Sequence, residues 1–456
     1  MSNSSSIALI TKDTGFSYGE LGVLSCSLVG PIPERALVFL QTSNSVEAVA
    51  FYCGCIAKGI VPLMIGKEPG TEVWQTLEEK YLPQFAWVRA GAVADGTVVS
   101  AHGCYELVQL RETSPKLHPD LALLLSTSGS TGSPKLVKLT RKNLHENAKS
   151  IAEYLGIEAS DKAIATLPFN YSYGISIVNS HLLAGAALIL TDESLMSRDF
   201  WTLLKEKEAS TFGGVPYTYQ MLKRLRFSRM ELPSLRYLTQ AGGRLGEELH
   251  EEFGRICAEK GIGFCVMYGQ TEATARMSYL PAERCLEKIG SIGVAIPGGE
   301  FSLIDEDGKL IASADVEGEL VYRGPNVSMG YATCVEELAA GDELCGVLRT
   351  GDMARRDEDG CYYITGRKGR FLKVFGNRIG LDELEQLMAK AGYTVAATGV
   401  DDHVELYVEN ADKADAIAAA AEATSLHPSA FAATRLEHLP RNAAGKIQYS
   451  QLKTGE

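Results

Sequence analysis

The sequence predicts an α/β protein with a large N-terminal part of helix-covered, mostly parallel sheets, a β-rich subdomain, and a small α+β part at the C-terminus. Strand-like and helix-like segments alternate to about residue 295, short strands and turns follow, and a helix, a strand pair and an alanine-rich helix come after about 369. Such alternation is typical of parallel sheets covered by helices, with ligands beyond the carboxyl ends of the strands. At 456 residues the chain exceeds one compact core, which predicts two or three domains.

The first half of the chain alternates clearly. Phe16-Ser17-Tyr18 leads into a helix-like segment, and an apolar strand at 36–40 precedes a helix at 45–58. Thr140 is a candidate N-cap for a helix at 141–155, because its hydroxyl can accept a hydrogen bond from the first helical turn. Further strands are predicted at 121–125, 135–139 and 186–190.

The second half continues the pattern and then changes. Helices are predicted at about 199–208, from Pro216 onward and at 246–260, with strands at 211–215, 235–239 and 263–267. Short strands at 301–304, 318–323 and 361–364, with a turn at 305–308, predict the β-rich subdomain. The last segment predicts a helix at 382–391, strands around 394–409 and a helix at about 411–423.

Composition excludes several classes of function. A net charge of −13 argues against nucleic-acid binding, because a phosphate backbone would be repelled. No apolar stretch is long enough to span a membrane. Met1–Ser6 is polar and lacks the features of a signal peptide, so we expect a cytoplasmic protein. The ten cysteines form no Cys-x-x-Cys pair, which predicts reduced core residues, and the histidines show no metal-ligand spacing.

A hydroxyl- and glycine-rich loop directly follows the apolar run at 121–125. Its glycines allow positive φ and a close approach of backbone N–H groups to an anion, and its hydroxyls add short donors. Lys135 ends the loop with a positive charge, but the spacing is not that of a Walker A loop. A phosphate-binding loop and an ordinary surface loop both fit the composition. The candidate ligands are Thr127, Ser128, Gly129, Ser130, Thr131, Gly132 and Lys135.

Five motifs in order resemble the acyl-adenylate-forming family of acyl-CoA synthetases, peptide-synthetase adenylation domains and luciferase-like enzymes. The loop from Thr127 to Lys135 resembles the phosphate signature of that family, and Tyr268-Gly269-Gln270-Thr271-Glu272 resembles its Tyr-Gly-x-Thr-Glu motif. Arg349-Thr350-Gly351-Asp352, Gly366-Arg367 and the segment from Pro440 to Lys446 are similar to its three later motifs. The resemblance covers nearly the whole chain and implies formation of an acyl-AMP from a carboxylic acid and ATP, with release of pyrophosphate.

The resemblance implies a role for each motif residue. Lys446, Thr271 and Glu272 would be catalytic: Lys446 would bridge the acid and the α-phosphate, Thr271 would donate to that phosphate, and Glu272 would hold Mg²⁺. Tyr268 would stack on adenine, and Asp352, assisted by Arg367, would accept the ribose hydroxyls. Gly242, Gly243 and Gly269 complete the predicted nucleotide site.

The family joins a large N-terminal domain to a mobile C-terminal lid. Here this implies domains at 1–367, with the β-rich subdomain at about 295–367, and at 368–456, with a hinge near 368–370. Rotation of the lid would bring Lys373, Gly376 and Arg378 to the site for transfer to a thiol. Gly369 stands where the family usually has Asp or Lys, and Lys368 or Arg370 could take over the role of that side chain.

The substrate pocket is expected around Asn170, Tyr173, Tyr217 and Met267, with Tyr219 and the two glycines at 242 and 243 as neighbours. The aspartate with which amino-acid-activating members hold an ammonium group is absent, so an α-amino acid is disfavoured. We expect a carboxylic acid with an uncharged apolar or aromatic body. CoA is the expected acceptor thiol, with the phosphopantetheine of an acyl or peptidyl carrier protein as the alternative. A non-catalytic nucleotide-binding relative is a third hypothesis.

Overall fold

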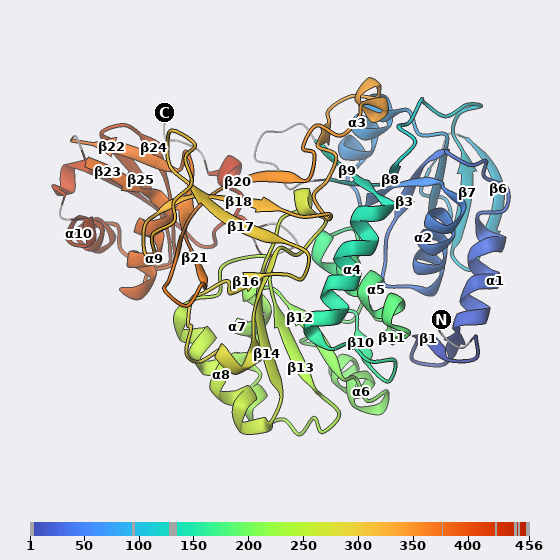
Figure 1. The fold of residues 1–456 in the computed structure, drawn as a ribbon, viewed down its shortest axis with the longest axis horizontal. Helices are drawn as coiled ribbons and strands as arrows, with labels where there is room; N and C mark the ends of the chain where they lie inside the picture. The colour runs from blue at the N-terminus through green and yellow to red at the C-terminus, as the bar shows by residue number, and fades with distance from the viewer. Residues whose placement is uncertain are drawn as a thin grey trace.

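The computed structural model describes residues 4–93, 96–126, 135–375, 377–424, 426–441, 445 and 447–452. Two large mixed sheets, one four-stranded antiparallel sheet and two small C-terminal sheets make up the fold. Figure 1 shows the C-terminal elements gathered at one end of the molecule, beside the four-stranded sheet.

The first large sheet has eight strands in the order β19-β9-β8-β4-β3-β5-β7-β6. Its centre is parallel, because β3 pairs in parallel with β4 and β5, and β4 pairs in parallel with β8. Antiparallel strands form both edges. Its strands are β3 (Leu37–Gln41), β4 (Val61–Ile65), β5 (Phe85–Arg89), β6 (Thr97–His102), β7 (Tyr105–Gln109), β8 (Leu121–Ser126), β9 (Leu136–Thr140) and β19 (Tyr331–Ala332).

The second large sheet has nine strands in the order β16-β15-β14-β13-β12-β10-β11-β1-β2. Its parallel centre ends at β14, and the N-terminal strand β1 joins it in parallel beside β11. Its strands are β1 (Ile7–Ile10), β2 (Gly15–Ser17), β10 (Lys162–Ile164), β11 (Ala187–Ile189), β12 (Thr211–Gly214), β13 (Tyr237–Gln240), β14 (Gly263–Tyr268), β15 (Ser278–Leu280) and β16 (Val294–Ala295).

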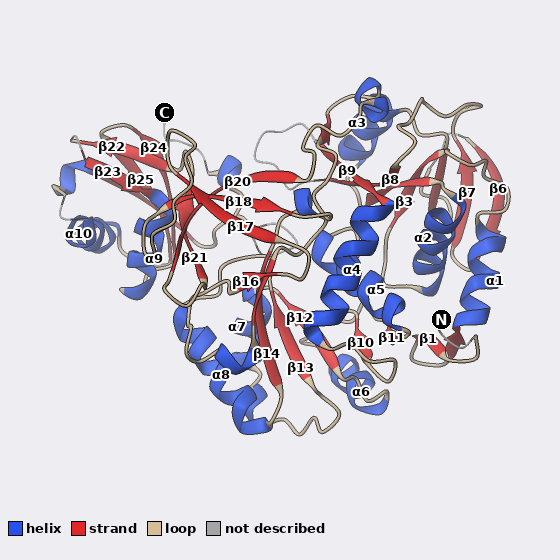
Figure 2. Cartoon of the chain, in the orientation of Figure 1, coloured by secondary structure: helices blue, strands red, loops and turns tan. Residues whose placement is uncertain are grey.

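Helices fill the space between the two large sheets and cover their outer faces (Figure 2). Side chains of α1 (Tyr18–Leu28), α2 (Val46–Lys58), α4 (Arg141–Leu155) and α5 (Ser172–Ala184) share one core with both sheets. The outer face of the second sheet packs on α6 (Arg198–Glu206), α7 (Pro216–Arg224) and α8 (Glu247–Lys260), and that of the first packs on α3 (Thr71–Tyr81). The α/β class with mostly parallel central strands is therefore confirmed.

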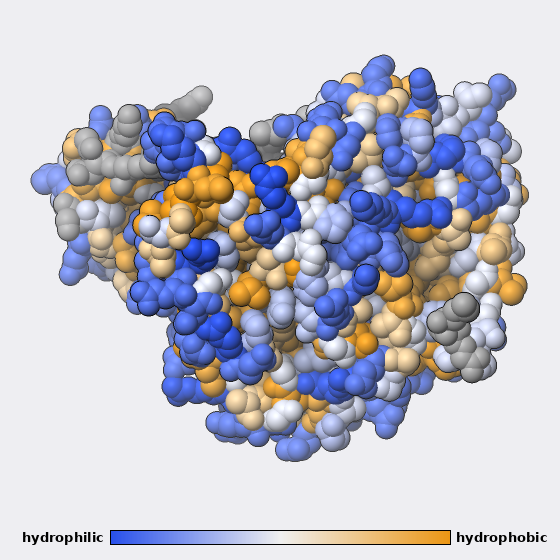
Figure 3. All heavy atoms as spheres, in the orientation of Figure 1, coloured by the Kyte–Doolittle hydropathy of each residue, from blue (hydrophilic) through white to orange (hydrophobic). Residues whose placement is uncertain are grey.

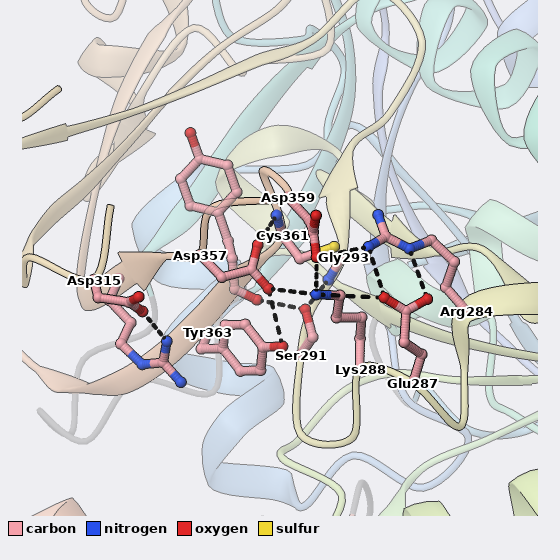
Figure 4. A network of polar contacts seen from close by, with 12 residues as sticks. Arg284, Glu287, Lys288, Ser291, Gly293, Asp315, Asp357, Asp359, Cys361 and Tyr363 are labelled. Atoms are coloured by element: carbon pink, nitrogen blue, oxygen red, sulfur yellow. Dashed lines mark hydrogen bonds and ion pairs between the residues drawn. The ribbon is translucent and has the colours of Figure 1, made fainter. Parts of the chain in front are cut away.

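The β-rich subdomain is a four-stranded antiparallel sheet in the order β17-β18-β20-β21. These strands are β17 (Glu300–Ile304), β18 (Gly318–Arg323), β20 (Val347–Arg356) and β21 (Tyr362–Arg367). An ion-pair network fastens the hairpin between β20 and β21 to the segment before β16. Lys288 is surrounded by Glu287, Asp357 and Asp359, and its ammonium group lies 3.1 Å from the Asp357 carboxylate (Figure 4).

The C-terminal part combines a hairpin, a three-stranded sheet and two helices around its own apolar core. Its elements are β22 (Phe371–Val374), β23 (Asn377–Gly380), α9 (Leu381–Lys390), β24 (Val395–Val400), β25 (His403–Glu409), α10 (Lys413–Thr424) and β26 (Phe431–Leu436). The sequence pattern predicted the two helices and the strands β24 and β25, but not β22, β23 or β26. A division at 368–370 stays a prediction.

The face in Figure 3 is mainly hydrophilic, with an apolar patch near β17. The turn after β17 carries two exposed apolar side chains, Leu310 and Val316. Within the described ranges, no helix is long and apolar enough to cross a lipid bilayer.

Candidate active site

Several predicted site residues lie at or just beyond the carboxyl ends of strands of the two large sheets. Ser126 ends β8, Gly242 follows β13, and Tyr268 ends β14. Such ends are where open α/β sheets bind ligands. Gly242 has a φ of +82°, and a Cβ there would lie 2.5 Å from the Tyr171 hydroxyl, so both backbone conformation and space require glycine.

Asp352, on the inner strand β20 of the four-stranded sheet, is the centre of a polar cluster. Its carboxylate accepts hydrogen bonds from the Tyr268 hydroxyl at 2.5 Å, Gln270 Nε2 at 2.8 Å and Arg367 Nε at 3.0 Å. The register of β20 and β21 places Asp352 opposite Arg367. Burial, followed by the charge of Asp352, raises the pKa of Tyr268. The cluster brings together three predicted nucleotide-site residues that are far apart in the sequence.

A second cluster joins Glu272 to the end of the predicted phosphate loop. Glu272 Oε1 accepts a hydrogen bond of 2.5 Å from the Tyr331 hydroxyl, and Lys135 Nζ lies 5.9 Å from the centre of the Tyr331 ring. The pairing of β19 with β9 places Tyr331 opposite Val137, beside the start of β9. The predicted magnesium ligand and the lysine of the loop therefore share one aromatic neighbour.

Thr271 lies beside the start of α5. Its hydroxyl is 3.1 Å from that of Ser172.

Gly269, three residues after the buried Val266 of β14, has no room for a side chain, because a Cβ would lie 1.8 Å from the Ala275 carbonyl oxygen. The Gly243 carbonyl oxygen accepts a hydrogen bond of 2.9 Å from Gln240 Nε2.

The predicted pocket residues do not form one group. Tyr173 and Met267 are buried and both contact Arg276, whereas Tyr217 is 51 % exposed on α7. Asn170 lies beside Gly66, and its buried Oδ1 has no hydrogen-bond partner among the described residues. The Tyr219 hydroxyl donates to the Thr239 carbonyl oxygen at 2.8 Å inside the core.

The loop at 127–134 and Lys446 lie outside the described residues. The residue before that lysine is described: Gly445 has a φ of +74°, and its Cβ position would lie 3.3 Å from Tyr217 Cβ. The C-terminal segment therefore touches α7, next to the carboxyl end of β12.

Two cations flank Gly369 and bind in opposite directions. Lys368 pairs with Glu319 of β18 at 2.8 Å, whereas Arg370 pairs with Asp382 and with Glu385 of α9, the latter at 2.8 Å. Gly369 has a φ of +87° and open space around its Cβ position. Lys368 thus contacts the part before the glycine, and Arg370 contacts the part after it.

Two of the predicted thiol-transfer residues, Lys373 and Arg378, lie on the paired strands β22 and β23. The register pairs Lys373 with Arg378, and Gly376 lies outside the described residues.

Several residues of the site carry no motif signal. Tyr331 and Tyr171 contact predicted site residues only because of the tertiary fold, and Arg276 is a buried cation beside the pocket. An arginine four residues after Glu272, in a segment that otherwise predicts burial, is the one sequence signal that could have indicated Arg276.

The chain is similar to known proteins in sequence and in fold. The family of AMP-binding enzymes matches residues 7–332. An oxalate–CoA ligase of Arabidopsis thaliana is 31 % identical over 73 % of this chain and 67 % of its own length. A 2-succinylbenzoate–CoA ligase of Bacillus pumilus is 29 % identical over 98 % of this chain and 95 % of its own.

A solved structure extends the similarity to the fold of the whole chain. The o-succinylbenzoate CoA synthetase of Bacillus subtilis, in complex with the acyl-adenylate intermediate OSB-AMP, superposes with a TM-score of 0.80. It is 23 % identical, and the match covers 99 % of this chain and 96 % of that one. By its family match, its relatives and its fold, this chain belongs to the AMP-binding enzymes of the acyl-adenylate-forming superfamily.

Proposed function

We propose that this protein is an AMP-forming acid–CoA ligase in which the two clusters described above position ATP and Mg²⁺. It activates a carboxylic acid with ATP and transfers the acyl group to CoA, as the relatives named oxalate–CoA ligase and 2-succinylbenzoate–CoA ligase do. The observation that carries the assignment is the convergence of Asp352, Tyr268 and Arg367 in one hydrogen-bonded cluster, with Glu272, four residues after Tyr268, bound to the tyrosine that also lies beside Lys135.

The Asp352 cluster suits the ribose and adenine. An ionised carboxylate accepts hydrogen bonds only, so it complements the two ribose hydroxyls, and its three protein donors hold it in place. The Tyr268 ring, whose hydroxyl donates to this carboxylate, offers a stacking surface for adenine.

The Glu272 cluster suits a hard cation beside phosphates. Magnesium binds one or two carboxylates together with phosphate oxygens and water, and Glu272 supplies one such carboxylate. Phosphate oxygens of the nucleotide and water would supply further ligands. Magnesium would neutralise charge on the phosphates, while Lys135 and the loop before it receive the leaving pyrophosphate.

Lys446 supplies the positive charge between the acid and the α-phosphate. The contact of Gly445 with Tyr217 supports this role, because it brings the C-terminal segment to the helix that follows β12. The division at 368–370, with Lys373, Gly376 and Arg378 acting in thiol transfer, belongs to the same proposal. So does a cytoplasmic location, which the ten free cysteines support.

The two half-reactions can be tested separately. The Lys446→Ala variant should lose acid-dependent exchange of pyrophosphate into ATP by about 100- to 1000-fold and still transfer the acyl group from supplied acyl-AMP to CoA. Wild-type protein offered CoA and a holo-carrier protein should form acyl-CoA. Full exchange activity in the variant would refute the role of Lys446, and acylation of the carrier protein alone would refute CoA as the acceptor.

A further inference from the structure

Arg276 is an arginine placed deep in the protein, where ionised side chains are rare. It is 2 % exposed, and its guanidinium carbon lies 4.6 Å from the centre of the Tyr173 ring. Nε donates to Ser176 Oγ at 3.2 Å, and Nη1 lies 3.2 Å from the Tyr154 hydroxyl and 2.7 Å from Met267 Sδ.

Within the described residues, nothing balances the charge of Arg276. No ion pair joins it to an acid among the described residues, and all its hydrogen-bond partners are neutral. Its second terminal nitrogen, Nη2, donates no hydrogen bond within the described part of the chain. A buried guanidinium without an anionic partner is costly, because it has lost water without gaining a counter-charge.

The backbone of Arg276 is also fixed. Its carbonyl oxygen accepts hydrogen bonds from Asn147 Nδ2 at 2.9 Å and from Asn326 Nδ2 at 3.1 Å. Two buried asparagines thus hold the arginine in position from its main chain, and the Tyr173 ring supports its planar group. A guanidinium group held in this way meets a ligand in one fixed orientation.

Arg276 lines a small cavity between α5 and the strands β12 and β13. The cavity has room for about one water molecule, and its wall carries the hydroxyl groups of Thr211, Thr239 and Tyr237. Asp161 acts electrostatically on His181 and Tyr237 of this wall, but it is already paired with Arg236 at 2.7 Å. The cavity therefore supplies at most a water molecule to Arg276, and the described residues of its wall include no carboxylate that could balance the charge of the guanidinium.

We propose that Arg276 binds a second anionic group of the substrate, an inference that rests on the proposed function. The activated acid would then be a dianion with a carboxylate or sulfonate at its far end. The pocket residues Tyr173 and Met267 connect this cation to the predicted nucleotide site. From the sequence we expected an acid with an uncharged body, whereas this inference assigns an acid with a charged distal group. The guanidinium of Arg276 accounts for this difference, because it stabilises an anion and offers an uncharged tail only an unpaired charge.

The experiment measures acid-dependent pyrophosphate release with pairs of acids that differ in one charge. Each dianion, such as succinate, glutarate, sulfoacetate or 2-succinylbenzoate, is compared with the neutral amide of its distal group. Wild-type protein should use at least one dianion with kcat/KM about 100-fold above its amide. Equal or better use of the amides throughout the panel would overturn the inference while leaving the ligase function in place.

Two variants distinguish a role of Arg276 in substrate recognition from a role in packing. Arg276→Met keeps an unbranched side chain without charge; it should lower kcat/KM for the dianion about 100-fold and leave that for the amide within a few-fold. Tyr154→Phe is the matched control, because it removes a hydrogen bond of Arg276 and keeps the charge, and it should preserve the preference. An equal loss for both acids in folded Arg276→Met protein would mean a structural role and overturn the inference.

Two further outcomes are also decisive. If Arg276→Met does not fold, the wild-type preference between dianion and amide, measured by kinetics and by calorimetric binding, decides the question alone. If no acid of either charge supports pyrophosphate release, the proposed ligase function fails, and the inference fails with it.

Discussion

His181 provides a quantitative test of the core beside the Arg276 cavity. It lies on α5, is 2 % exposed, and its Nδ1 is 2.9 Å from the Ile177 carbonyl oxygen. Its Nε2 is 3.4 Å from the Tyr237 hydroxyl. Burial lowers the pKa of His181 from 6.5 to about 4, an effect that its backbone hydrogen bond only partly opposes. The folded protein therefore holds this imidazole neutral.

The sign and size of the effect on stability follow from these two pKa values. Between pH 6.5 and 4 the unfolded chain binds a proton that the folded protein does not, so the free energy of unfolding rises with pH in this window. The stabilisation is complete above pH 6.5 and is lost as pH falls. The loss from this one group is about 2 kcal/mol at pH 5 and about 3 kcal/mol below pH 4.

The His181→Asn variant isolates this contribution, because its amide can still donate to the Ile177 carbonyl oxygen and does not titrate. Urea unfolding of both proteins, followed by tryptophan fluorescence between pH 7.5 and 5, gives the difference in free energy of unfolding. All three tryptophans lie before residue 368, so the signal reports on the part that contains His181. The wild type should lose about 2 kcal/mol relative to the variant. A difference that does not change with pH would refute the assigned pKa.

Three further predictions concern the nucleotide site and the ion-pair network. Asp352→Ala should raise the KM for ATP about 10- to 100-fold, since it removes charged hydrogen bonds to the ribose; an unchanged KM in ATP kinetics would contradict this. Gly242→Ala should impair ATP binding, measured by calorimetry, because the new methyl group meets the Tyr171 hydroxyl at 2.5 Å; wild-type affinity would contradict it. Lys288→Met should lower the melting temperature, because it leaves Asp357 and Asp359 without their shared cation. Added salt should reduce that difference, and a melting temperature equal to wild type would show that the network is dispensable.

Local patterns predicted the elements that have one polar face and clear ends. The helix expected at 141–155 is α4, and Thr140 caps it through a hydrogen bond from the Asn143 N–H group at 3.0 Å. The helix expected at 246–260 is α8, which begins one residue later at Glu247. In both cases the sequence shows an amphipathic period and a glycine just past the end, and these are the strongest local signals of a helix.

Elements buried on all sides escaped the pattern. Nine of the thirteen residues of α5 are buried, so the helix has no polar face to reveal its period. It also contains Gly174, where a Cβ would lie 2.2 Å from the Pro168 carbonyl oxygen. In the sequence this glycine suggests a turn, whereas in the fold it allows close packing inside a helix. Strand β26, with the sequence Phe-Ala-Ala-Thr-Arg-Leu, is too weakly apolar to be recognised before its pairing with β25 is known.

The residues of the candidate site likewise fall into those predictable from local sequence patterns and those that depend on the tertiary fold. Motif residues such as Asp352 and Glu272 were predictable, because their chemistry is tied to short sequence patterns around them. Arg276 and Tyr331 were not, because their importance comes from what surrounds them: the first from the lack of a buried counter-charge, the second from a two-strand pairing between segments almost two hundred residues apart. Neither environment is encoded near the residue itself.

Tyr173 joins the two halves of the site. Its ring lies 6.4 Å from that of Tyr171, whose hydroxyl packs over Gly242 of the predicted nucleotide site, and 4.6 Å from the guanidinium carbon of Arg276, the proposed contact of the acid. Its hydroxyl group donates to the Thr239 carbonyl oxygen at 2.9 Å, which anchors the ring to β13. Burial raises the pKa of Tyr173 to about 12, so the phenol stays neutral beside the arginine and does not balance its charge. A chain with a net charge of −13 thus holds a buried positive charge that no acid of the described residues balances, and the reaction proposed for this protein is one that must bring two anions together.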